Sequence, residues 1–152
     1  MVKLEGFAEF EAQLLAMAEG YRSDLVAKNT LVKAAQIAME PVLSDAIMAA
    51  PYDEKNTSGL HLKDSAKLAA RIPNENDKKS DYVNETDAAI AVVSFRKSSV
   101  SLSQEFGNAT TPAHPFLRVS LERNVQRVLD TLKSQLAIEI PKYAKRLQRG
   151  KR

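Results

Sequence analysis

The spacing of apolar residues near the start of the chain predicts a helix. Apolar residues recur there at spacings of 3, 4, 3 and 4, which places them on one helical stripe. They are Phe7, Phe10, Leu14, Met17 and Tyr21. Such a stripe is typical of core packing or of docking on the next helix, and a docking role toward a partner subunit stays open.

A second helix is predicted from about residue 23 to residue 50. Ser23 or Asp24 can accept a hydrogen bond from the first free backbone amides, as an N-cap does. Apolar residues then recur three or four positions apart, at Val32, Ala35, Met39, Val42, Ala46 and Ala49. Pro41 lacks a backbone N–H and crowds the preceding turn, so we expect a kink or a break there. Pro51 is predicted to end the segment.

The clearest helical pattern lies in the last third of the chain. Leucines and valines follow one another at spacings of 4, 4, 3, 4 and 4. They are Leu117, Leu121, Val125, Val128, Leu132 and Leu136. Pro115 suits the first turn of this helix, where its missing N–H is no loss. Pro141 is expected to end or kink it.

Between the helices, alternating patterns predict strands. Residues 65–72 alternate as a strand does, although their alanine and lysine content favours a helix, and we expect a strand. Residues 87–95 and 99–106 are predicted to be two strands joined by the polar link 96–98, hence an antiparallel hairpin. The predicted fold class is α+β, in which a small antiparallel β-sheet packs against long amphipathic helices and a long helix lies at the C-terminus.

Composition is compatible with one domain. The chain has 152 residues, of which 44% are apolar. We expect a single α+β domain over residues 1–141, followed by a basic tail over residues 142–152. No stretch approaches the roughly 20 apolar residues of a membrane-spanning helix. The N-terminus also enters an amphipathic pattern directly, so no membrane association and no secretory signal are expected.

Positive charge is concentrated at the C-terminal end. Residues 142–152 contain six basic residues and no acidic one: Lys142, Lys145, Arg146, Arg149, Lys151 and Arg152. The remainder of the chain has 16 basic and 19 acidic residues, a net charge of −3. The tail is either a solvated C-terminus or a site of contact with DNA phosphates, where neutralised charges release counterions.

The sequence offers little for catalysis or metal binding. It has no cysteine, and its five glycines are too dispersed for a phosphate-binding loop. Its two histidines, His61 and His114, are far apart, which does not favour a histidine-rich metal site. Asp53-Glu54 and Glu105 could in principle form an acid–base pair, but carboxylates are common on protein surfaces, which disfavours a catalytic role. We therefore expect no enzyme, no cofactor and no metal.

Two segments resemble a known family. Ala50-Pro51, Thr57-Ser58-Gly59-Leu60 and Lys63-Asp64-Ser65 are similar to an "A-P-x-D-T-G-x-L-x-x-S" stretch. Glu105-Phe106-Gly107 and Pro112-Ala113-His114-Pro115-Phe116-Leu117-Arg118 resemble an "E-F-G-T … P-A-x-P-F-L-R-P-A" block. Both occur in a family of tailed-phage head–tail joining and tail completion proteins, named after a gene product of the lambdoid Hong Kong phage. The resemblance covers roughly residues 20 to 140. The chain departs from it in a longer 52–58 loop, in Asn108 and in Val119-Ser120.

A physical role is predicted for the second block. A strand ending at Phe106 would anchor an aromatic ring in the core, and Gly107 would permit a left-handed turn. Pro112 and Pro115 would stiffen the entry to the helix. The side chains of Phe116 and Leu117 are then predicted to be buried in the core. The alternative is that the block serves folding alone.

The resemblance implies a structural virion protein of the phage neck, made in the host cytoplasm. It implies a homo-oligomeric ring, of six subunits to match the tail, between the head connector and the tail tube. Its partners would be other neck and tail proteins, with non-specific contact to DNA in the channel. Candidate contact regions are the first helical stripe and the loops 52–62 and 107–114. The alternative function is a small nucleic-acid-binding protein that uses the basic tail.

Overall fold

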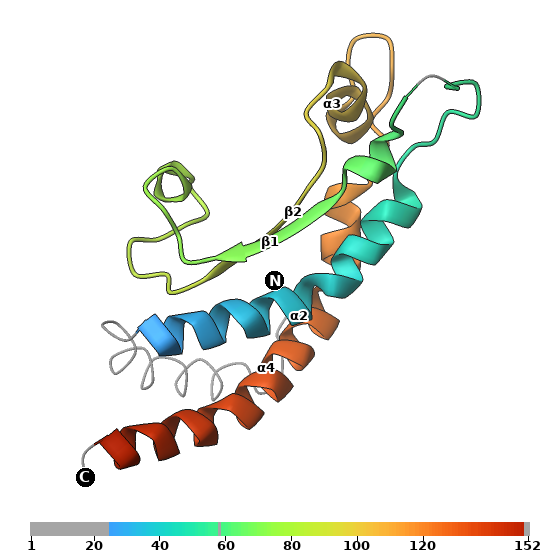
Figure 1. The fold of residues 1–152 in the computed structure, drawn as a ribbon. Coiled ribbons are helices and arrows are strands. Elements are labelled where there is room, and N and C mark those ends of the chain that lie inside the picture. The colour runs from blue at the N-terminus through green and yellow to red at the C-terminus, as the bar shows by residue number, and fades with distance from the viewer. Residues whose placement is uncertain (1–24, 58, 151–152) are drawn as a thin grey trace. The chain divides into compact units, whose positions relative to one another are not determined.

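A computed structural model describes residues 25–57 and 59–150 of the chain (Figure 1). Its elements are α2 (Leu25–Ala49), β1 (Lys67–Arg71), β2 (Ile90–Ser94), α3 (Ser99–Phe106) and α4 (Leu117–Gly150), with short 3₁₀ helices at Leu62–Ser65 and Asp77–Lys79. The two strands pair into an antiparallel sheet accompanied by long helices, which confirms the predicted α+β class. The helix predicted from Phe7 to Tyr21 lies outside the described residues.

The chain divides into two compact units. The first contains residues 1–37, 70–91 and 129–152, and the second contains residues 38–69 and 92–128. In the first unit, Ala34 of α2 and Leu136 of α4 form a buried pair. Leu31, Leu132 and Ile140 pack around it. Because alanine is small, it lets the two helices of this unit approach each other closely.

The core of the second unit joins a helix to the sheet. Val42 and Ala46 of α2 pack with Val93 of β2 in one buried cluster. Leu68 of β1 and Leu117 of α4 lie against the cluster. Since side chains alternate between the two faces of a strand, this packing identifies the face of the sheet that is covered. A two-stranded sheet is marginal in water by itself, so helix packing stabilises it.

The buried side of α2 only partly follows the predicted stripe. Val42 and Ala46 are buried as predicted, whereas Ala49 is exposed. The fully buried positions are Ala27, Ala34, Ala38, Val42 and Ala46. The helix continues through Pro41 without a break, although a proline there removes one backbone hydrogen bond.

The hairpin predicted from residues 87–95 and 99–106 is wrong. The partner of β2 is β1, and residues 99–106 form α3. Ser98 caps this helix, because its hydroxyl accepts the Ser101 N–H at 3.1 Å and its own N–H donates to the Ser101 hydroxyl at 2.9 Å. Such reciprocal capping favours a helix over the strand that the alternation of Val100 and Leu102 suggested. The strand predicted over residues 65–72 is confirmed by β1.

The last helix is longer than predicted. It begins at Leu117, so Pro115 lies two residues before it rather than in its first turn. It continues through Pro141 to Gly150. The basic residues from Lys142 to Arg149 therefore lie on a helix.

Candidate functional site

The most highly organised part of the structure is the junction between α3 and α4, where one carboxylate accepts hydrogen bonds from the backbone at the start of α4. Glu105 is buried near the end of α3. Its Oε2 accepts the backbone N–H groups of Phe116 at 2.9 Å and Leu117 at 3.0 Å. Its Oε1 accepts the N–H of Arg118 at 3.0 Å. Glu105 therefore supplies an N-terminal cap to α4 from another helix, and its charge also complements the helix dipole.

Gly107 turns the chain out of α3. Its φ is +74°, in the left-handed region predicted for it. A Cβ at this position would lie 2.8 Å from the backbone nitrogen of Ala113 and 3.1 Å from the carbonyl oxygen of Thr111. Glycine is thus required both by the backbone angle and by the close approach of the loop.

The loop that follows holds its own shape. Asn108 Oδ1 accepts the backbone N–H groups of Thr110 at 2.9 Å and Thr111 at 2.8 Å. The Asn108 N–H donates to the carbonyl oxygen of Thr111 at 2.8 Å. The His114 N–H then donates to the carbonyl oxygen of Gln104 in α3 at 2.7 Å, closing the loop onto the helix. His114 serves the loop through its backbone, while the residue as a whole is exposed.

The aromatic residues of the block do not share one environment. Phe116 is 4% exposed and meets Phe95 edge to face, with ring centroids 5.0 Å apart. Phe116 and Leu117 therefore belong to the core, as predicted. Phe106 was predicted to be buried, and this is wrong, because it is 71% exposed. Successive residues on a helix are about 100° apart, and Ser101 and Glu105 mark the buried side of α3, so Phe106 faces away from that side.

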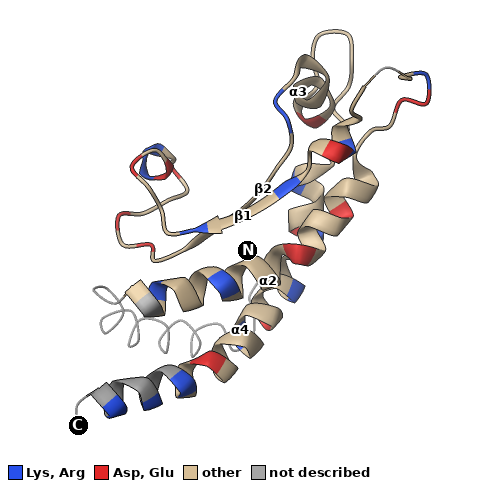
Figure 2. Cartoon of the chain, viewed as in Figure 1, with Lys and Arg blue, Asp and Glu red and all other residues tan. Residues whose placement is uncertain are grey.

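The side of α3 that faces away from the core is exposed, apolar and uncharged. The α3 surface, as we call it, consists of Val100 (58% exposed), Leu102 (41%) and Phe106. Between Ser98 and Pro115 the sequence has one charged residue, Glu105, and that carboxylate faces inward. Figure 2 shows α3 and the following loop almost without charged positions. Loop residues 108–110 and 112–114 are exposed beside it.

Residues 50–65, the first segment that resembles the phage family, have several different structural roles. The Ser65 hydroxyl donates to the Leu62 carbonyl oxygen at 2.6 Å and accepts the Arg96 N–H at 3.0 Å. Leu60 is exposed, and a Cβ on Gly59 would meet nothing within 4 Å. Pro51 follows α2 and is half-buried. The structure thus gives Ser65 a clear contact, and gives Gly59 no steric reason to be glycine.

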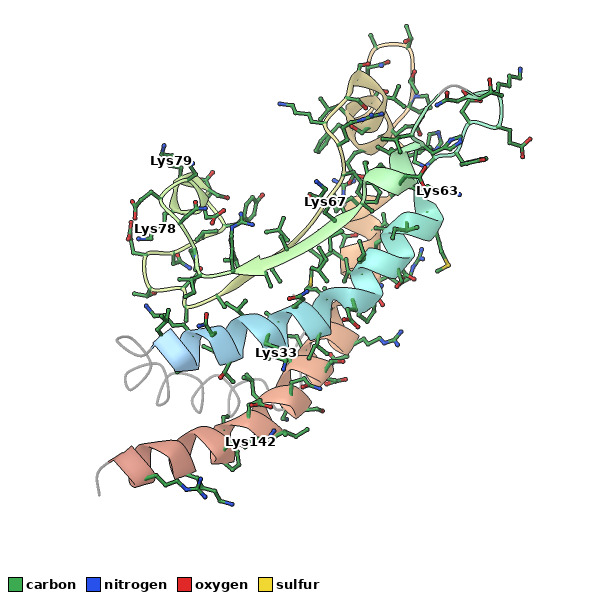
Figure 3. All side chains as sticks on the ribbon, viewed as in Figure 1. Lys33, Lys63, Lys67, Lys78, Lys79 and Lys142 are labelled. Atoms are coloured by element: carbon green, nitrogen blue, oxygen red, sulfur yellow. The ribbon has the colours of Figure 1, made fainter. Side chains whose placement is uncertain are left out.

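The 52–62 loop ends beside a small aromatic stack. The rings of Tyr52 and His61 are stacked, with their centroids 4.2 Å apart and their planes inclined by 29°. The ammonium group of Lys63 lies 4.5 Å from the centre of the Tyr52 ring, a cation–π distance. Figure 3 labels Lys63. These contacts bring the two ends of the loop together.

Two carboxylates of the possible acid–base pair, Asp53 and Glu105, have structural partners. Asp53 accepts the Lys55 N–H at 2.9 Å, and Glu105 is used as the helix cap. Within residues 25–57 and 59–150, no three of His, Asp and Glu gather as a metal site requires. Among the described helices, none has the length and apolar character needed to cross a membrane.

One ion pair in the first unit shifts two pKa values. The Arg71 guanidinium donates to both carboxylate oxygens of Asp77, and Asp77 also accepts the Asn74 N–H at 2.9 Å. The hydrogen bond from Arg71, followed by that from Asn74, holds the pKa of Asp77 below its usual value. The hydrogen bond to Asp77 raises the pKa of Arg71 in turn.

No family model, curated protein or solved structure matches this chain. The arrangement of its residues therefore carries the functional argument.

The positions of the phage-like segment between residues 105 and 118 meet at one corner, whereas Pro51, Gly59, Leu60 and Ser65 lie along a separate stretch between α2 and β1. Two contributions were missed from the sequence: the cap by Glu105 and the loop scaffold of Asn108. An asparagine with threonines two and three residues later is a recognisable turn signal, but the partners of Glu105 lie 11 to 13 residues away.

Proposed function

We propose that this chain is a structural, non-enzymatic component of a tailed-phage neck. It acts in tail completion or head–tail joining by assembling into a ring between the head connector and the tail tube. The resemblance of residues 50–65 and 105–118 to that family motivates the proposal. The α3 surface is the structural observation that carries it.

Three properties of the α3 surface favour an interface. It exposes an aromatic ring and two aliphatic side chains, and exposed apolar patches often mark contact sites. It lacks charge, and charged residues are depleted in the cores of protein interfaces. It is also rigidly supported by the Glu105 cap and the Asn108 loop, so little order has to be gained on association.

A ring also constrains what the α3 surface meets. Closed rings use head-to-tail contacts, in which two different surfaces of the same chain come together. The second unit exposes other large apolar residues at Met48, Tyr52 and Leu60, around the 52–62 loop. We propose that this loop region of one subunit receives the α3 surface of the next. The number of six subunits comes from the resemblance alone.

The experiment is native mass spectrometry of the full chain and of Phe106→Ser, alone and with tail-tube protein. The wild-type chain is expected to give a ring, and Phe106→Ser is expected to give monomers with an unchanged circular dichroism spectrum. Tyr82→Ser is the matched control, because Tyr82 is an exposed aromatic residue outside the α3 surface. A strictly monomeric wild-type chain under both conditions would contradict the proposal. Equal loss of assembly in Phe106→Ser and Tyr82→Ser would show that the α3 surface is not the interface.

A further inference from the structure

The C-terminal turns of α4 concentrate positive charge on one side. Because α4 continues past Pro141, residues 142–149 follow helical spacing. Lys142, Lys145, Arg146 and Arg149 stand at positions i, i+3, i+4 and i+7, which lie on one face of a helix. We call these four residues the basic face. Figure 2 shows basic positions recurring along this end of α4.

The basic face is accessible and short of counter-charges. Lys145 and Arg149 are exposed, and the Lys142 side chain is 58% exposed (Figure 3). Lys142 pairs with Glu139 at 3.1 Å, and the sequence has no acidic residue after Glu139. Like charges three or four positions apart on a helix repel each other by about 0.2–0.5 kcal/mol per pair. A bound polyanion would relieve that repulsion.

The helix dipole explains only part of this pattern. Cations are favoured near a helix C-terminus, but the effect is confined to about the last turn. It accounts for Arg149 near the end of α4, whereas Lys142 and Lys145 lie farther back. The dipole does not account for these two cations, of which Lys142 also pairs with Glu139.

We propose that the basic face binds the phosphate backbone of nucleic acid without reading its sequence. The four cations lie within residues 142–149, seven helical steps or about 10.5 Å at the rise of an α-helix. Duplex DNA presents one charge per about 1.7 Å of its axis, an array dense enough to engage all four.

A membrane surface fits the segment less well. A helix that lies on a membrane needs a broad apolar face rich in Trp, Phe or Leu. Residues 142–152 contain neither Trp nor Phe, and Leu147 is their only leucine. The rest of the chain has a net charge of −3, so the excess of positive charge lies at this end of the sequence. This inference does not depend on the α3 surface, and either can fail without the other.

The test measures binding of the full chain to a labelled 30-base-pair DNA duplex of mixed sequence, by fluorescence anisotropy at 50–200 mM salt. With four phosphate contacts, the slope of log K against log [salt] is expected near −3.6, about a 100-fold loss over this range. A second duplex of unrelated sequence should bind within about twofold, because phosphate contacts carry no sequence information.

The variant Lys142→Gln/Lys145→Gln/Arg149→Gln should reduce the magnitude of the slope by about 2 to 3. Glutamine is a good helix former, so α4 should persist by circular dichroism. The matched control is Lys55→Gln/Lys67→Gln/Lys97→Gln, which removes three exposed charges outside α4 and should bind as the wild type does. Absent or salt-independent binding would overturn the inference, as would equal loss in both variants. Tighter binding to phosphatidylserine vesicles than to DNA would also overturn it.

Discussion

The Glu105 carboxylate in α3 accepts the backbone N–H of Arg118 in α4 at 3.0 Å. The same carboxylate accepts the N–H groups of Phe116 and Leu117. The corner between these helices is therefore organised around a buried charge, with Phe106 turned to the outside. The same arrangement supports the first helical turn of α4 and exposes the α3 surface.

Replacing Glu105 by glutamine is expected to destabilise the fold. Glutamine keeps one acceptor oxygen, and its amide N–H groups would face backbone donors. The expected loss in free energy of unfolding is about 2–3 kcal/mol, the scale of hydrogen bonds to a charged group. Urea denaturation followed by circular dichroism measures it. Glu122→Gln, at an exposed position on α4, is the control and should stay within about 0.5 kcal/mol of the wild type. Equal stability of Glu105→Gln and the wild type would contradict the capping role.

Gly107→Ala should also destabilise the protein, for a different reason. Alanine would have to adopt a positive φ, and its Cβ would approach the Ala113 nitrogen to 2.8 Å. A strained backbone of this kind costs about 1–3 kcal/mol. Gly59→Ala is the matched control, because a Cβ there meets nothing within 4 Å. Thermal unfolding should separate the two variants, and similar melting temperatures would argue against a required glycine at 107.

The ion pair between Arg71 and Asp77 predicts a dependence of stability on pH. The folded state lowers the pKa of Asp77, so the carboxylate stabilises the protein fully above the pKa of an unfolded aspartate, about 3.9. That contribution is lost as the pH falls through the lower folded-state pKa. The stability difference between the wild type and Asp77→Asn should thus be constant above about pH 5 and shrink in more acidic solution.

Denaturation curves from pH 7 to pH 2 provide the measurement. Asp81→Asn, at an exposed position in the same connection between the strands, should show a much smaller difference at every pH. A difference for Asp77→Asn that grows on acidification would contradict the assigned direction.

Long periodic patterns predicted two helices, α2 and α4, which the structure confirms. The leucine and valine spacing that identified α4 extends over several turns, and the buried Val42 and Ala46 follow the pattern predicted for α2. Short patterns were ambiguous. Val100 and Leu102 alternate with serines as strand residues do, yet Ser98 and Ser101 cap a helix there. Alternation over the four residues 100–103 cannot outweigh a helix cap at Ser98 and a glycine of positive φ at position 107.

The functional features were harder to anticipate. The turn at Gly107 follows from the residue type, because glycine tolerates a positive φ. The exposure of Phe106 cannot be inferred from its residue type, because it depends on whether residues 99–106 form a helix or a strand. Partners of Glu105 lie across a loop, and no local pattern in the sequence indicates them.

The small Ser65 side chain has a consequence for the sheet. Its hydroxyl ties the turn before β1 to the backbone just after β2, at Arg96. A shift of one residue in strand pairing would point Val93 to solvent and Val92 to the interior. A sheet of two short strands has few ladder bonds with which to resist that slip. The hydrogen bonds of Ser65, a side chain outside the ladder, thus help to fix the register in which β1 and β2 pair.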